Sequence, residues 1–223
     1  MLRGLVLSLA ALPLAACSLP PGRGGETRQP PVREGPPAIA TSQSGQCFAR
    51  LGAAGVNFSP LPDRYLAQGC TNLGTVQLRD LPSDASRLAI VNVGPVTCEV
   101  SQAFAAWARF GADRAARQIL GSPLRAVETF GSYSCRDVAG SGRRSAHATA
   151  AAIDISGFVL ADGRRITIAG GWDGRSEAER RFLRIVHHSA CRRFATVLGP
   201  DYNSAHRDHL HFEGVAQARA YCR

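Results

Sequence analysis

The sequence contains no lysine, no histidine before His147 and no pair of cysteines in the C-x-x-C spacing. All 26 basic residues are therefore arginine, and with 17 acidic residues they give a formal net charge of +9. Without a C-x-x-C pair, the sequence offers no sign of a cysteine-ligated zinc site. Hydrophobic residues make up 45% of the chain and charged residues 19%, so the chain can bury a core and global disorder is excluded.

The N-terminus also lacks a long hydrophobic run. After a basic start, the apolar run from Leu5 to Ala16 is too short for a stable transmembrane helix and is typical of an export signal. It ends in Leu14-Ala15-Ala16-Cys17, which resembles a bacterial lipobox, whereas an ordinary signal peptide is the alternative. We expect a lipoprotein signal peptide over residues 1–16 and a lipid on Cys17. Serine at the next position resembles an outer-membrane address, so we expect a lipid-anchored protein on the periplasmic side of the envelope, at the outer membrane.

Residues 17–42 predict a tether between this anchor and a folded domain. Six prolines and four glycines occur among residues 18–42, without hydrophobic periodicity. An extended segment of this length reaches on the order of 75 Å. Residues 43–223 are then expected to form one domain. A separate module over residues 43–95 is the alternative, but such a segment is too short to bury much core by itself.

Once Cys17 is assigned to the lipid, an even number of cysteines remains in an exported domain. Six cysteines in such a domain indicate three disulfides, for which 15 connectivities are possible. Local spacing favours Cys47–Cys70. Placing the predicted site strand and the long helix side by side favours Cys135–Cys191, which leaves Cys98–Cys222.

The hydrophobic pattern predicts an α+β fold, in which a small antiparallel sheet is flanked by helices and stapled by disulfides. Helices are expected over residues 98–120, 176–198 and 215–221, and strands over residues 126–133, 151–160, 165–169 and 209–213. Asp162-Gly163 marks a hairpin turn between two of these strands. Ser176 and Glu179 have the spacing of a capping box at the start of the second helix.

Two segments carry side chains suited to metal binding. On a strand, Ala152 and Asp154 share one face, where small neighbours leave room for a cation beside the carboxylate. His147 lies just before this strand, and a loop can bring it to Asp154. In the second segment His209 and His211 are two residues apart, so a strand places both on one face.

Imidazole and carboxylate ligands together suit zinc, and a catalytic zinc site uses three protein ligands with one open position. The triple is His147, Asp154 and one histidine of the second segment. Either pattern alone is usually a solvated pair or a chance match. Their joint occurrence, with no histidine earlier in the chain, argues against chance, and we expect the sheet to carry a zinc site.

The segment Ser145-x-His147-x-x-Ala150-x-Ala152-x-Asp154 resembles the S-x-H-x-x-G-x-A-x-D motif of zinc peptidases that cut bacterial cell-wall peptides. These include D-Ala-D-Ala carboxypeptidases and murein endopeptidases, and the hedgehog signalling domain shares their fold. From about Cys47 onward the chain is more closely similar to the bacterial extensin-like C-terminal domain family. That likeness rests on the residues just described and on Gly131-Ser132-Tyr133-Ser134-Cys135-Arg136, Leu198-Gly199-Pro200-Asp201-Tyr202-Asn203 and His206-x-Asp208-His209-x-His211.

The resemblance implies Zn²⁺ ligation by His147, Asp154 and His211. Some of these peptidases place an acidic residue three positions before the last histidine ligand, which maps onto Asp208, and others use an H-x-H, which maps onto His209 and His211. We expect Asp208 as the base that takes a proton from water, with His209 orienting the water or stabilising the oxyanion; His209 as the base is the alternative. An ideal strand would place Asp208 on the face opposite His209, so Asp208 can serve only if the strand begins after it. Arg136 is the first candidate to polarise a substrate carbonyl or hold a carboxylate.

This sequence departs from the motif at two positions, and the departures bear on which subfamily of these peptidases it resembles. Ala150 stands where the motif has glycine, and no tryptophan precedes His211.

These expectations favour an envelope-anchored zinc peptidase that hydrolyses amide bonds in peptidoglycan stem peptides. A zinc-containing, non-catalytic wall-binding lipoprotein is the alternative, since fold does not imply activity. A disulfide-stapled structural protein with fortuitous histidines is a third. The basic charge suits an acidic wall polymer. It would also suit nucleic acid, but export argues against that partner, and we expect a monomer.

Overall fold

The structure is a computed structural model of the chain and describes residues 42–223. The predicted signal peptide, the lipidation of Cys17 and the predicted tether, apart from its last residue, lie outside the described residues. Within residues 42–223, no helix combines the length and the apolar character that crossing a membrane requires.

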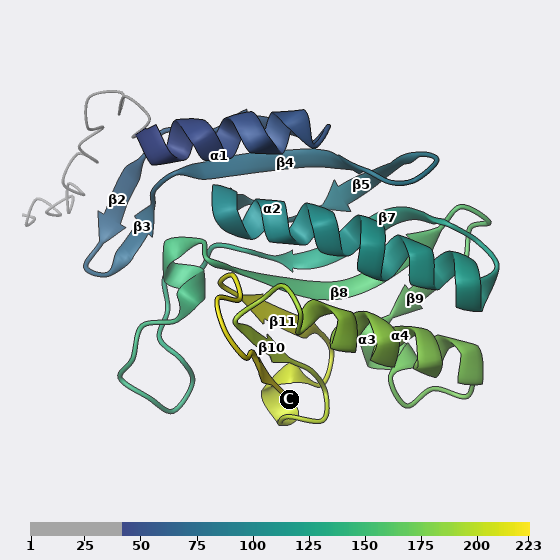
Figure 1. Cartoon of the computed structure of the whole chain (residues 1–223). Coiled ribbons are helices and arrows are strands. Elements are labelled where there is room, and N and C mark those ends of the chain that lie inside the picture. Colours follow the sequence, from purple (N-terminus) through teal and green to yellow (C-terminus); the bar gives the residue numbers. More distant parts are fainter. Residues whose placement is uncertain (1–41) are drawn as a thin grey trace, which may run out of the picture. The chain divides into compact units, whose positions relative to one another are not determined.

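The described residues form an α+β fold around one large sheet (Figure 1). Its ten strands follow the order β1-β4-β5-β7-β8-β11-β10-β12, with β6 added to β4 and β9 to β8. The strands are β1 (Asn57–Pro60), β4 (Thr75–Pro82), β5 (Arg87–Val91), β6 (Pro95–Thr97), β7 (Leu124–Gly131), β8 (Ala152–Leu160), β9 (Arg165–Thr167), β10 (Thr196–Leu198), β11 (Leu210–Glu213) and β12 (Tyr221–Cys222). A separate hairpin pairs β2 (Arg64–Ala67) with β3 (Cys70–Asn72).

The sheet differs from the small antiparallel sheet expected from the sequence. It is larger, because β1, β4, β5 and β6, from residues 57–97, also belong to it. It is also mixed, because β5 pairs with β7 and β10 pairs with β12 in parallel. The predicted strands near residues 126–133, 151–160, 165–169 and 209–213 are confirmed as β7, β8, β9 and β11.

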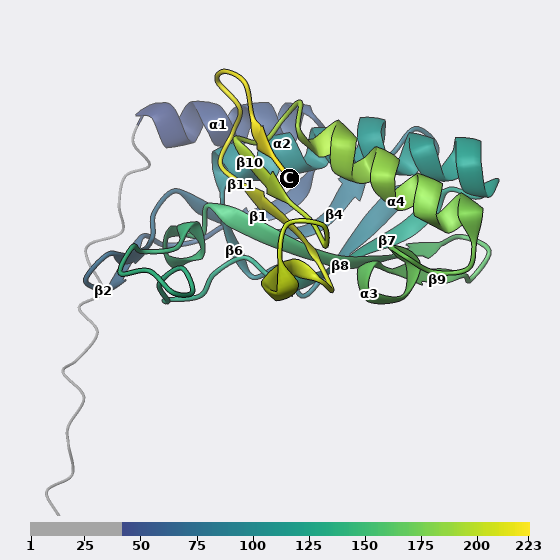
Figure 2. The same ribbon diagram turned by 90° about the horizontal axis from the view of Figure 1, so that it is seen from below.

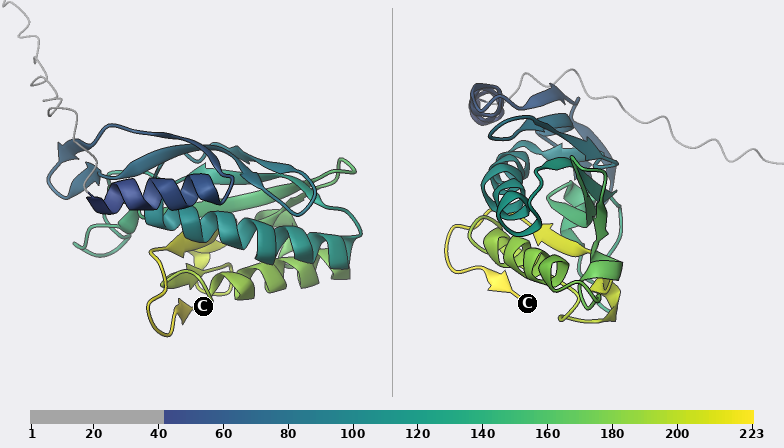
Figure 3. Two further views of the ribbon diagram at one scale, coloured as in Figure 1. Left: turned by 45° about the horizontal axis from the view of Figure 1, so that its top comes forward. Right: turned by 90° about the vertical axis from the view of Figure 1, so that its right-hand side faces the viewer.

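Three helices cover one face of this sheet: α1 (Ser42–Ala53), α2 (Cys98–Trp107) and α4 (Glu177–Ala190), as the view from below and the end view show (Figure 2 and Figure 3). Helix α2 continues through two π-helical stretches, Ala108–Asp113 and Ala116–Leu120. The short α3 (Ile168–Gly171) follows β9. The predicted helix over residues 98–120 is therefore confirmed.

The core lies between these helices and the sheet. Trp107 of α2 meets the ring of Phe212 on β11 edge-on, with the ring centroids 4.8 Å apart. Phe158 of β8 meets Phe182 of α4 in the same way, with centroids 5.1 Å apart. All four side chains are fully buried, and truncating one such aromatic costs about 3–5 kcal/mol. This packing fixes which side chains of β8 and β11 face the helices. Because side chains alternate along a strand, it also fixes which ones face the opposite side of the sheet.

Of two predicted helices near the C-terminus, the first is confirmed but ends earlier than expected, and the second is wrong. Helix α4 begins at the Ser176 cap as expected, but it ends at Ala190, and residues 196–198 form β10. Gly199 and Pro200 directly follow this strand, and not the end of the helix. Residues 215–221 form no helix, because pairing with β10 holds the chain extended at β12.

The disulfides confirm the number expected but none of the pairs. The structure joins Cys47 to Cys98, Cys70 to Cys135, and Cys191 to Cys222, with Cα–Cα distances of 6.1, 5.5 and 5.9 Å. Tertiary packing decides these partners rather than sequence spacing: α1 lies against the start of α2, and hairpin β2–β3 reaches the loop after β7. The predicted pairs Cys47–Cys70, Cys135–Cys191 and Cys98–Cys222 are therefore wrong.

Candidate metal centre

Two adjacent strands place Asp154 beside His211. In the antiparallel pairing of β8 and β11, these residues stand directly opposite each other. The next pair along, Ile153 and Phe212, points to the other face, where Phe212 packs against the helices. On the other side of β8, Gly131 stands opposite Asp154 and adds no side chain. The alternation of both strands therefore leaves Asp154 and His211 on the face that the three helices do not cover.

His147 reaches the same place from a single 3₁₀ turn, Ala146–Thr149. The hydroxyl of Ser145 caps this turn by accepting the backbone N–H of His147. Ala150 ends the turn in the left-handed region, at φ 53°, before β8 begins. A left-handed residue is the usual way to leave a helical turn, and glycine adopts it with less strain than alanine. The structure thus gives a physical reason for the glycine of the resembling motif.

The three side chains turn their donor atoms toward one another. His147 Nε2 lies 3.2 Å from an Asp154 carboxylate oxygen and 3.2 Å from His211 Nδ1, and His211 Nδ1 lies 2.9 Å from the other Asp154 oxygen. All three residues are buried, and one donor atom from each lies within 4.8 Å of the other two. The three residues that the resemblance implies as ligands are thus brought together.

The donor set fits a zinc ion. Two imidazole nitrogens and one carboxylate oxygen are common zinc ligands, and three protein ligands leave a position for water. The outward nitrogen of each ring is also held: His147 Nδ1 lies 2.6 Å from the carbonyl oxygen of Ser132, and His211 Nε2 lies 3.2 Å from a Glu213 carboxylate oxygen. Such outer contacts fix ring orientation at metal sites.

Without a metal, the same groups share protons. Burial would raise the pKa of Asp154, but hydrogen bonds from His147 and His211 outweigh it and hold that pKa far below its ordinary value. Burial would lower the pKa of His211, but its hydrogen bonds with Asp154 and Glu213 raise that pKa to about 9. A metal ion would therefore displace a proton from His211 on binding.

Of the two predicted catalytic groups in the second segment, His209 faces the cluster. Its Nε2 lies 3.6 Å from an Asp154 oxygen, while its Nδ1 lies 2.9 Å from Asp208 Oδ1. Asp208 therefore contacts His209 and not the three ligands. Asp208 is not placed on the strand face opposite His209, because β11 begins only at Leu210, after both residues.

His211 of this cluster lines a cleft of about 500 Å³, whose other lining residues include Arg136, Arg143, Tyr202, His206, His209 and Glu213. Arg136 thus lies where the sequence analysis placed it, beside the site. Burial and the neighbouring histidines lower the pKa of His206 to about 4. His206 is therefore neutral near pH 7, and its Nδ1 lies 2.7 Å from the side-chain oxygen of Asn203.

Sequence reasoning missed Glu213 and Arg143 as part of this site. Glu213 could have been found, because it is two residues from His211 on a strand and therefore shares its face. Arg143 carried no such signal, since it reaches the cleft from an irregular loop.

Within residues 42–223 a second group of potential ligands consists of His187, Cys191 and Cys222. The two cysteines form a disulfide, so their sulfurs are committed to each other.

Comparison with known proteins adds one finding. A family model described as the extensin-like protein C-terminus matches residues 45–223. The search of curated proteins and the search of solved structures gave no match.

Proposed function

We propose that this chain, which belongs to the extensin-like protein C-terminus family, is an envelope-anchored zinc peptidase that hydrolyses amide bonds in peptidoglycan stem peptides. The proposal includes a relation to the zinc peptidases of cell-wall metabolism. One observation carries it: a buried triad of zinc-type donors lies beside an imidazole whose far nitrogen contacts a carboxylate, and this imidazole and His211 of the triad line a cleft.

His147, Asp154 and His211 would hold the zinc, which when bound would act as a Lewis acid toward water and the substrate carbonyl. In the tautomer in which His209 Nδ1 donates a hydrogen bond to Asp208, the lone pair of Nε2 faces the site. His209 Nε2 would accept the proton of the attacking water and deliver it to the leaving amine. Asp208 would orient the ring and stabilise its protonated form.

This assignment changes the roles expected of two residues. The sequence pattern favoured Asp208 as the base, whereas the distances favour His209 in that role and Asp208 as a positioning residue. Arg136 and Arg143 line the cleft from one loop and supply positive charge. They would hold a carboxylate or carbonyl of the stem peptide, which carries both groups.

Incubation of purified sacculi with the zinc-loaded, oxidised protein tests the proposal, with peptide fragments identified by mass spectrometry. New peptide ends are expected with the wild type and with His188→Ala, a matched control because His188 is an exposed histidine on α4. His209→Ala should retain zinc but lose about 10²–10⁴-fold in rate. His211→Ala should lose both zinc and activity.

The non-catalytic alternative predicts a different result. The wild type would then bind one zinc per chain and would bind to sacculi, yet release no fragments under any zinc-replete, oxidising condition. Absence of bound metal from the wild type would contradict both the peptidase and the zinc-containing binding protein.

A further inference from the structure

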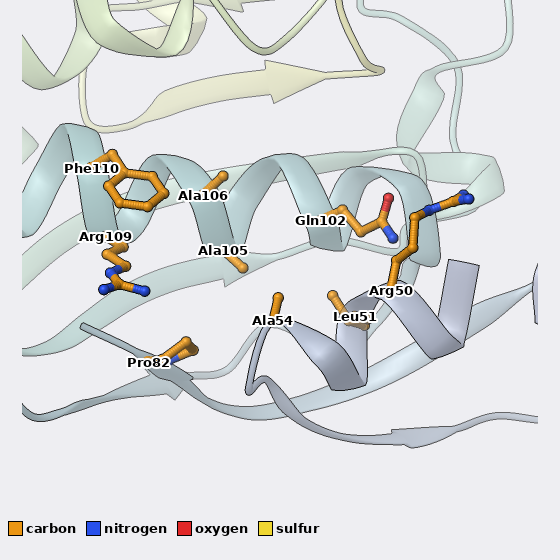
Figure 4. Close-up of a pocket in the computed structure, with 9 residues that line it drawn as sticks. All are labelled: Arg50, Leu51, Ala54, Pro82, Gln102, Ala105, Ala106, Arg109 and Phe110. Carbon is orange, nitrogen blue, oxygen red and sulfur yellow. The ribbon is translucent and has the colours of Figure 1, made fainter. Parts of the chain in front are cut away.

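A groove of about 300 Å³ lies between α1 and α2, on the helical side of the molecule (Figure 4). Leu51 from α1, Ala54 directly after α1, Ala105 from α2 and Pro82 give it an apolar lining. Arg50 and Arg109 also line it, one from each helix. The groove therefore combines an apolar lining with guanidinium groups.

A second groove, of about 470 Å³, runs along the other side of α2. Gln102 and Ala106 line both grooves, so α2 forms a ridge between them. The far wall of the second groove includes Arg192, Arg193 and Val215. We call the two grooves and their shared ridge the helical face.

Phe110 stands at one end of this ridge, with 44% of its surface exposed. The guanidinium carbons of Arg109, Arg114 and Arg193 lie 5.0, 4.7 and 5.9 Å from its ring centroid. Basic side chains together with exposed Phe, Trp or Leu are typical of helices that lie in a membrane interface.

The charge of the helical face identifies the kind of partner it fits. Five arginines surround it: Arg50, Arg109, Arg114, Arg192 and Arg193. The acidic groups beside it are Glu99, on the second groove, and Asp84, which pairs with Arg109 and Arg114. The occupant should therefore be anionic and partly apolar. Residues 18–41 carry more arginine than glutamate, and a second copy of this chain has a net charge of +9, so neither provides that charge.

The helical face also points away from the cleft. Phe212 packs against Trp107 of α2, and the neighbouring His211 points to the opposite face of the sheet. Figure 2 shows α1, α2 and α4 together on one side of the sheet. A surface bound along these helices would leave the candidate metal centre facing the solvent.

We propose that the helical face docks on a membrane that contains anionic phospholipid. The apolar linings would take up acyl-chain surface, and the arginines would contact lipid phosphates. The biological setting rests on the envelope location proposed above, because a tether of the predicted length keeps the domain beside a membrane. Docking would then turn the cleft toward the cell wall.

Quenching by brominated lipid tests this in the full chain, because it requires contact of one position with the bilayer and not attachment alone. The Phe110→Trp variant adds an indole at the helical face, whereas Trp107 and Trp172 are buried and serve as background in the wild type. In vesicles of phosphatidylcholine with brominated phosphatidylglycerol, the added indole should be quenched, and high salt should reverse this. Vesicles of brominated phosphatidylcholine alone should quench it little.

Charge variants in the Phe110→Trp background complete the test. Each arginine near an anionic surface contributes about fivefold, so Arg50→Gln with Arg192→Gln should lower the ratio of docked to free domain about thirtyfold. Arg64→Gln with Arg125→Gln is the matched control, since both arginines are exposed and line neither groove.

The proposal is overturned if no quenching occurs, or if quenching is the same with and without anionic lipid and is unaffected by these substitutions. Lipid-free dimerisation that Arg50→Gln with Arg192→Gln abolishes, seen by sedimentation, would assign the face to a second copy instead. Zinc content and sacculus cleavage should be unchanged in these variants, so failure of docking and failure of the proposed peptidase function are distinguishable.

Discussion

Two buried aspartates in this protein have opposite kinds of surroundings. Asp113, at the end of a π-helical stretch after α2, has no exposed surface, and its oxygens accept the backbone N–H of Leu124 at 2.8 Å and Arg117 Nε at 2.9 Å. Asp154 on β8 is nearly as buried, but the groups closest to its oxygens are the rings of His147 and His211.

The partners decide what each carboxylate can do. A backbone N–H and a guanidinium cannot give up their protons near neutral pH, so Asp113 joins the long helix to the first residue of β7 and does nothing else. Imidazoles exchange protons near neutral pH and bind metals, so Asp154 is suited to share a cation with its neighbours. Burial alone would not distinguish these two carboxylates.

Asp154→Asn should produce the largest effect, and this effect should be a loss of zinc affinity rather than a loss of folding stability. Removing the carboxylate charge should lower zinc affinity by more than about hundredfold, beyond the loss usual for an outer contact of a metal site. Zinc titration with a competing chelator measures it. Wild-type affinity in this variant would show that Asp154 is no ligand.

Asp113→Ala should have the reverse profile. It leaves the Leu124 N–H and the Arg117 guanidinium without their acceptor, so the free energy of unfolding should fall by about 1–3 kcal/mol. Zinc stoichiometry should stay at the wild-type value. Denaturant unfolding in the presence of chelator measures the first quantity, and a stable variant with reduced zinc content would reverse the comparison.

The pH dependence of zinc binding should follow the protons on the triad. The depressed pKa of Asp154 stabilises the metal-free fold above its ordinary value of 3.8, and this contribution is lost as the pH falls below it. The pKa of His211, raised from 6.5 to about 9, stabilises that fold below pH 6.5 and ceases to do so as the pH rises through about 9.

Zinc would have to displace the His211 proton. Its affinity should therefore rise by up to about tenfold per pH unit between pH 6.5 and about pH 9. Calorimetric titration over this pH range, in buffers of different ionisation enthalpy, also counts the proton released. A pH-independent affinity with no proton release would contradict the assignment of His211 as a ligand.

Ala150→Gly should have the smallest effect and should strengthen the turn that brings His147 to Asp154. Because Ala150 has φ 53°, glycine should relieve strain and stabilise the protein by about 0.5–1 kcal/mol. Ala148→Gly, a control within the same buried turn but without positive φ, should be destabilising. Thermal unfolding of both variants measures the contrast, and equal shifts would contradict it.

The candidate site could be predicted largely because it depends on alternation within short strands. Alternation predicts the faces of Asp154 and His211 on their own strands, whereas the choice of His211 rather than His209 as the third ligand came from the family resemblance. The assignment of His209 against Asp208 could not be predicted, since it depends on β11 beginning at Leu210. A difference of one residue in a strand boundary decides which side chain meets the cluster.

Long-range packing explains the other failures. Residues 196–198 continue a helical pattern locally, but pairing with β11 makes them a strand. The strands before residue 95 join the main sheet through a parallel contact of β5 with β7, for which the chain carries no local signal. The disulfide partners failed for the same reason.

The connectivity of those disulfides has a consequence for how the protein matures. The bonds Cys47–Cys98 and Cys70–Cys135 interleave along the chain, and only Cys191–Cys222 joins consecutive cysteines of the described region. A chain oxidised strictly in the order of its emergence from a translocation channel would join Cys47 to Cys70 and Cys98 to Cys135. Both bonds would then have to be exchanged, so the yield of natively bonded protein should depend on a thiol–disulfide isomerase as well as on an oxidant.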